Sequence, residues 1–155
     1  MRFFSSLLAV VPAILAVQGS ALVARQSGVG VGGTIVAPAA GSTIINGEPF
    51  PFQYNNNHVC QDGYSPIHVY LTATAPTAAD VSSSGTIANA LHYFGLYTIA
   101  NFGLPPMNSP PPTFTAPALS YEGEFFLAVV ETYLTCPPDG HTAYGLSSNP
   151  VEYQA

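Results

Sequence analysis

The fold class of this chain depends most on one apolar stretch, EFFLAVVETYL, which runs from Glu124 to Leu134. Apolar side chains occupy both alternating sets of positions, so a strand made from this stretch must be covered on both faces. The pattern predicts a central strand of a sheet. Glu131 is a charged residue inside the run, and we expect it to face outward near the strand end; a buried glutamate is the alternative.

Other runs on both sides of this stretch also have strand character. Residues 67–74 alternate apolar with polar side chains, and Phe50, Phe52 and Tyr54 fall on one face of the run that starts at Pro49. Turns rich in Gly, Pro and Asn separate the shorter runs, which are Thr34–Ala37, Thr43–Ile45, Leu91–Ile99, Thr113–Ala116, Thr142–Ser147 and Val151–Tyr153. A helix over residues 78–93 is an alternative for that segment. About seven short strands predict an all-β chain, folded as an immunoglobulin-like or fibronectin-III-like β-sandwich.

The first 21 residues have the order of a secretory signal peptide. Met1 and Arg2 give a positive start, residues 3–17 carry no charge, and small residues follow at Gly19 and Ala21. A membrane anchor is the alternative, but an anchor needs about 20 apolar residues and this run is shorter. We expect a secreted, extracellular protein without a membrane anchor. Residues 22–33 would form a flexible lead-in or short pro-segment, and residues 34–155 the domain.

The charge balance restricts the partners. The chain has no lysine, its two arginines are Arg2 and Arg25, and its net charge is −6. A nucleic-acid-binding protein needs a basic surface, so we expect no nucleic acid partner. Anionic lipids and acidic polysaccharides are disfavoured for the same reason. A neutral cell-wall polysaccharide or an extracellular protein fits this composition.

The chain has two cysteines, Cys60 and Cys136. A pair of cysteines in a secreted chain predicts a disulfide, and two free thiols are the alternative. The bridge would close most of the domain into one loop and contribute roughly 4 kcal/mol of stability in the chain-entropy description.

A Cys60–Cys136 bridge would bring its flanking segments together at one tip of the domain, within about 10 Å of one another. Two imidazoles and two carboxylates would then meet there, from His58, Asp62, Asp139 and His141. Such a set can hold a divalent metal or hydrogen-bond a sugar. The alternative is that they are ordinary polar turn residues.

The N-terminal part of the domain has the frame Ile35-x-x-Pro38-x-x-Gly41-x-x-Ile44-x-x-Gly47-x-Pro-Phe50-x-Phe52-x-Tyr54. Later pieces fit the same layout, namely FTAPAL from Phe114, the Glu124–Tyr133 run and YGLSSNPV from Tyr144. This pattern resembles the immunoglobulin-like domain of fungal cell-wall proteins, found at the N-terminus of yeast-type glucan-assembly and Ser/Thr-rich anchored wall proteins. The resemblance implies a β-sandwich and a fungal extracellular setting, and it supplies no catalytic residues.

Signatures of hydrolases are missing from the sequence. There is no Gly-x-Ser-x-Gly or His-Glu-x-x-His motif, and Glu122 and Glu124 would share one face of a strand instead of opposing each other. We therefore expect a non-enzymatic module without a cofactor, acting in cell-wall or surface interactions. The first alternative is a carbohydrate-binding module with an aromatic platform drawn from Tyr64, Tyr70 and Tyr144. A metal-binding extracellular protein or an enzyme is the more distant alternative.

Overall fold

The computed structural model describes residues 28–57, 63–101, 103–136, 138 and 140–155. Ten strands form in this part of the chain: β1 Val29–Val31, β2 Thr34–Ala37, β3 Ser42–Ile45, β4 Pro49–Pro51, β5 Gln53–Asn55, β6 Tyr64–Thr72, β7 His92–Ala100, β8 Thr113–Thr115, β9 Gly123–Leu134 and β10 Thr142–Gln154. A single 3-10 turn, η1 Ala78–Asp80, is the helical segment among the described residues. The all-β prediction is confirmed, and residues 78–93 do not form the alternative helix. Among the described residues, no helix has the length and apolar character needed to cross a membrane.

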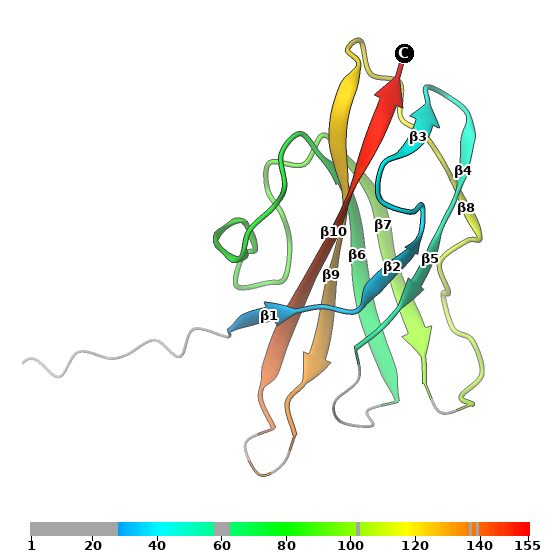
Figure 1. The fold of residues 1–155 in the computed structure, drawn as a ribbon. Helices are drawn as coiled ribbons and strands as arrows, with labels where there is room; N and C mark the ends of the chain where they lie inside the picture. Colours follow the sequence, from blue (N-terminus) through cyan, green and yellow to red (C-terminus); the bar gives the residue numbers. More distant parts are fainter. Residues whose placement is uncertain (1–27, 58–62, 102, 137, 139) are drawn as a thin grey trace, which may run out of the picture.

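The larger layer is a six-stranded sheet in which β9 lies between β10 and β6 (Figure 1). The strand order is β1-β10-β9-β6-β7, and β3 also pairs with β10. Both neighbours of β9 are antiparallel to it. Residues 127–131 are all buried, which confirms that EFFLAVVETYL forms a central strand covered on both faces.

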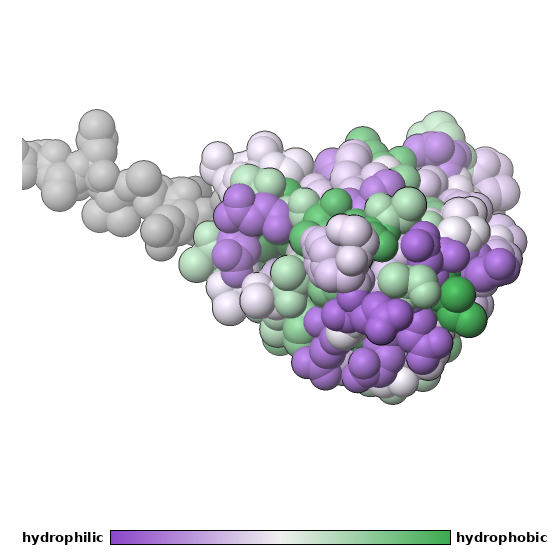
Figure 2. Space-filling model, turned by 90° about the horizontal axis from the view of Figure 1, so that it is seen from above, coloured by the Kyte–Doolittle hydropathy of each residue, from purple (hydrophilic) through white to green (hydrophobic). Residues whose placement is uncertain are grey.

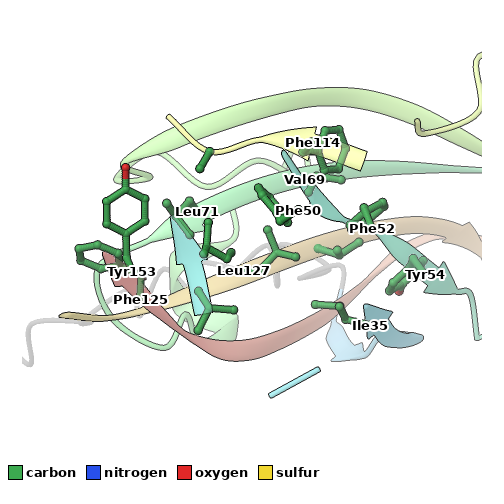
Figure 3. Close-up of a cluster of buried hydrophobic side chains, with 14 of the residues drawn as sticks. Ile35, Phe50, Phe52, Tyr54, Val69, Leu71, Phe114, Phe125, Leu127 and Tyr153 are labelled. Carbon is green, nitrogen blue, oxygen red and sulfur yellow. The ribbon is translucent and has the colours of Figure 1, made fainter. Parts of the chain in front are cut away.

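The second layer consists of two short antiparallel pairs, β2 with β5 and β4 with β8. Its side chains and the inner face of the large sheet enclose the main core (Figure 3). Tyr153 and Phe125 lie at one end of this core, and Tyr54 and Ile35 lie toward the other. Phe114 packs between aromatic rings, with its ring centroid 4.8 Å from those of Phe52 and Phe94. An apolar interior of this kind supplies most of the free energy of folding.

The N-terminal strands alternate between the two layers. β1 and β3 run parallel to β10 in the large sheet, whereas β2 crosses to the second layer and pairs with β5. Residues 29–31, which the sequence placed in a flexible lead-in, are therefore the first strand of the large sheet. Asn149 donates hydrogen bonds to the carbonyls of Ile35 and Pro38, and Ser147 donates one to the carbonyl of Gly33.

β10 is one continuous strand, where the sequence predicted two pieces separated near Pro150. On the edge that faces β1 and β3, β10 pairs with β1 up to Leu146 and with β3 from Val151. Pro150 falls in the gap between these two partners. A proline lacks an N–H, so a stretch of edge without a pairing strand is where a strand can accept it.

The predicted strand over residues 49–54 is divided at Phe52. β4 pairs with β8 and β5 pairs with β2, while the Phe52 N–H bonds to the carbonyl of Pro112 at 2.8 Å. Phe50, Phe52 and Tyr54 are nevertheless all buried, as their alternation predicted.

The proline-rich segment of residues 104–112 is mostly exposed and runs beside β7. Asn108 is its main attachment, because its carbonyl accepts the Thr98 N–H at 2.9 Å and its side-chain amide donates to the carbonyl of Leu96 at 2.9 Å. The Tyr64 hydroxyl donates to the carbonyl of Pro105 at 3.1 Å. The segment is thus the extended surface connection that its composition predicted.

Two glycines let β1 lie against β10. A Cβ on Gly145 would lie 2.6 Å from the Cα of Gly32, and a Cβ on Gly32 would lie 2.6 Å from the Ser147 hydroxyl oxygen. Any side chain at these positions must displace backbone. The close approach of the two chain segments therefore explains the glycines at residues 32 and 145.

We predict that Gly145→Ala lowers the free energy of unfolding by about 1–3 kcal/mol, because the added methyl group meets backbone that cannot move aside cheaply. Denaturant unfolding followed by circular dichroism measures the change. Gly28→Ala is the matched control, since a Cβ there meets nothing within 4 Å. Equal stability of the two variants would contradict the prediction.

Candidate functional site

The loop of residues 73–91, between β6 and β7, folds over the outer face of the large sheet (Figure 1). It buries a second, smaller apolar cluster there. Val81 and Ile87 come from the loop and pack with side chains of β6, β9 and β10, which are Tyr70, Ala128, Val130 and Tyr144. The large sheet is therefore covered on both faces at its centre.

The loop has its own internal hydrogen bonds. Val81 and Ile87 form an isolated β-bridge, and the hydroxyl of Ser82 lies 2.8 Å from that of Ser84 and 2.9 Å from that of Thr86. Tyr144 fixes the loop from below, because its hydroxyl donates to the carbonyl of Ser83 at 2.9 Å. The tyrosine ring leaves no room for a side chain at residue 85, where a Cβ would lie 2.4 Å from a ring carbon of Tyr144.

Between this loop and the β6–β7 edge lies a hollow of about 490 Å³. Its lining is neutral and combines aromatic, small apolar and polar side chains, from His68, Tyr70, Thr86, Ile87, Ala88, Ala90, Leu91, His92 and Tyr93. A second hollow, of about 320 Å³, shares Ile87 and Ala88 with the first. Its other lining residues are mostly polar, namely Thr72, Thr74, Pro76, Ala79, Asp80, Ser82 and Asn89. We call the two hollows together the outer groove.

Three rings lie together on the sheet side of the outer groove. The centroid of Tyr93 is 5.0 Å from that of Tyr70 and 5.8 Å from that of His68, with interplanar angles near 30°. The His68 Nδ1 and the Tyr93 hydroxyl are hydrogen-bonded at 2.9 Å. Tyr93 is 46% exposed and Tyr70 only 3%, so Tyr93 is the ring that a ligand can touch.

Burial changes the proton affinities at this site. It lowers the pKa of His68 and of His92, and it raises the pKa of Tyr70 and of Tyr93. All four shifts favour the uncharged form. The sheet side of the outer groove is therefore electrically neutral at pH 7.

The aromatic platform expected from the sequence is not assembled. Tyr70 and Tyr144 are 3% and 8% exposed beneath the loop, and neither can stack on an external ligand. Tyr64 lies elsewhere, in a separate hollow of about 110 Å³ beside Tyr133. The sequence did not single out Tyr93, because aromatic and apolar side chains occupy both faces of the run from Leu91 to Ile99. That pattern predicted a strand buried on both faces, without an exposed ring.

The proposed metal or sugar tip lies largely outside the described residues. His58, Cys60, Asp62 and Asp139 belong to that part, so the tip and the disulfide stay predictions. His141 is described, and its backbone N–H donates to the Thr135 hydroxyl at 3.0 Å in the turn between β9 and β10. In the described ranges, no group of three or more metal-binding side chains occurs.

Glu131 is buried, at 0% exposure, and the prediction that it faces outward is wrong. One carboxylate oxygen accepts hydrogen bonds from the Tyr54 hydroxyl at 2.8 Å and from the backbone N–H groups of Gly33 and Asn57 at 3.2 Å each. Burial, and next the charge of Glu131, raise the pKa of Tyr54. Because no external molecule reaches this carboxylate, its role is to join strands.

No protein-family model matches the chain, and no curated protein matches it either.

We predict that Tyr54→Phe lowers the free energy of unfolding by about 1–3 kcal/mol, because it removes one donor from a buried carboxylate. Denaturant unfolding measures the loss. Tyr121→Phe is the control, since Tyr121 is 45% exposed. An unchanged stability for Tyr54→Phe would show that the Glu131 cluster does not hold the layers together.

The lowered pKa of His68 and of His92 predicts an acid-sensitive stability. As the pH falls below about 6.5, these histidines bind protons in the unfolded chain more readily than in the folded protein. Proton binding therefore favours the unfolded state, and the free energy of unfolding falls with decreasing pH. Thermal unfolding between about pH 7.5 and 5.5 measures the slope. The double variant His68→Gln/His92→Gln should show a smaller slope than the wild type. Parallel slopes would contradict the assignment.

Proposed function

We propose that this chain is a secreted, non-enzymatic interaction module that acts at the cell wall or cell surface. The proposal includes an immunoglobulin-like or fibronectin-III-like sandwich with a Cys60–Cys136 bridge. Two layers of mainly antiparallel strands around one core support the fold type. The residue pattern of the N-terminal strands, similar to that of fungal wall domains, supports the setting.

The outer groove is the observation that carries the proposal. It consists of two hollows on the face of the large sheet that points away from the main core, and Asp80 is their one charged lining residue. Residues 26–155 contain neither lysine nor arginine. An anionic partner, which would need basic side chains to hold it, is therefore disfavoured. Figure 2 shows apolar and hydrophilic residues interleaved on the end of the domain that carries the C-terminus. The outer groove, which has no lysine or arginine in its lining, suits uncharged partners.

The position of Glu131 removes the acid that the sequence made the most interesting candidate for catalysis. Glu131 is the one acid that the sequence placed within a core strand, and acid–base catalysis needs a carboxylate that reaches its substrate. Here the carboxylate is enclosed by its own strands. Its hydrogen bonds are those of a fixed structural group.

We predict that the purified protein co-sediments with isolated cell-wall material or with one of insoluble glucan, chitin and cellulose. Binding should persist in about 1 M NaCl, because salt screens interactions between charges and the proposed contacts are between uncharged groups. The fraction depleted from the supernatant measures binding, and a heat-unfolded sample is the control for trapping. Full recovery in the supernatant with every material would refute the proposed function.

A further inference from the structure

The two hollows of the outer groove adjoin at Ile87 and Ala88, and each has the size of a small-ligand site. Their volumes are about 490 and 320 Å³, and sites for small molecules span about 300 to 1,000 Å³. One hollow is aromatic and the other is polar. A molecule that lies across both must therefore offer an apolar face and hydrogen-bonding groups together.

The aromatic hollow presents the face or edge of one ring, that of Tyr93. This ring is held in place by the rings of Tyr70 and His68 and by the hydrogen bond to His68. A fixed and half-exposed tyrosine loses little side-chain entropy when a flat apolar surface stacks on it. The C–H face of a pyranose ring is such a surface.

The polar hollow offers two exposed, neutral side chains that both donate and accept hydrogen bonds, the Thr74 hydroxyl and the Asn89 amide. The hydroxyls of Thr72 and Ser82 also line it, but they are already bonded to the protein itself. Asp80 is its charged member. The carboxylate of Asp80 accepts hydrogen bonds from the backbone N–H of Thr77 at 2.7 Å and from its hydroxyl at 2.8 Å. These bonds lower the pKa of Asp80, which keeps a negative charge beside the hollow.

The charge and polarity of the outer groove disfavour anionic ligands and purely apolar ligands. An anionic ligand would meet the Asp80 carboxylate and no lysine or arginine, since the described chain contains none. A purely apolar ligand would displace water from the Thr74 hydroxyl and the Asn89 amide and would give them no partner in return. A neutral molecule rich in hydroxyl groups satisfies both hollows.

We propose that the outer groove binds a segment of a neutral oligosaccharide. One sugar ring stacks on Tyr93, and its hydroxyl groups lie beside His68. The next sugar lies beyond Ala88, where its hydroxyl groups enter the polar hollow. This inference rests on the proposed function, because it names the partner class of the same site.

Calorimetric titration with laminarihexaose, cellohexaose and chitohexaose tests the inference. The wild type should bind at least one of them. Tyr93→Ala should weaken its Kd about tenfold, because the stacking surface is lost. Tyr93→Phe should stay within about threefold, since it keeps the ring and loses only the bond to His68.

Ala88→Leu provides a second variant that does not disturb a buried group. Ala88 is exposed at the junction of the two hollows, so a leucine fills the path between them without entering either core cluster. It should also weaken the Kd about tenfold or more. Tyr121→Ala is the matched control, because Tyr121 is as exposed as Tyr93 but contacts Phe125 in another part of the fold. Its affinity should equal that of the wild type.

The outcomes separate the two proposals. If the wild type binds an oligosaccharide and Tyr93→Ala and Ala88→Leu bind it equally well, the outer groove is not the site and the proposed function stands. If the wild type sediments with wall material and binds none of the three sugars, the inference of a sugar is overturned and the partner is of another class. If the wild type binds neither wall material nor sugar, both proposals fall.

Discussion

The carboxylate of Glu131 sits between the two layers, and the course of the N-terminal half depends on keeping it hydrogen-bonded. Burying a carboxylate without hydrogen-bond partners costs several kcal/mol. Each donor around it must therefore stay within hydrogen-bond distance in the folded state. Three of its donors come from β5, from Gly33 in the link between β1 and β2, and from the chain just after β5. Gly33 must be a glycine here, since a Cβ would lie 2.1 Å from the Asn55 carbonyl oxygen. One polar group thus fixes where the first two strands run.

The sequence was informative where side-chain periodicity reports burial. The apolar run of β9, the alternation of β6 and the buried faces of Phe50, Phe52 and Tyr54 all follow from it. Periodicity could not report the burial of Glu131, because its partners, the Tyr54 hydroxyl and two backbone N–H groups, are distant in sequence. It also could not show that the strand from Pro49 divides between two partners, since pairing does not alter the alternation.

The outer groove was beyond the reach of the sequence for a related reason. One of its walls is the loop of residues 73–91, whose small polar residues have no period and predicted only a loop, and the other wall comes from β6 and β7. That loop covers Tyr70 and Tyr144, so the tyrosines that looked exposed by alternation are buried, while Tyr93 is left at the surface. Burial by a loop depends on tertiary packing, which alternation in a single strand does not encode.

The attachment of the proline-rich segment to β7 affects how copies of this protein behave beside one another. An edge strand normally offers a row of open N–H and C=O groups on which a second chain can add a strand. Here the Thr98 N–H and the Leu96 carbonyl are already bonded to Asn108, and prolines flank that residue without an N–H of their own. A second chain that pairs with residues 96–98 must first displace this segment, so the edge is a poorer template for intermolecular sheet growth than a bare strand would be. The chain thus provides a local protection of β7 against cross-β association at high concentration.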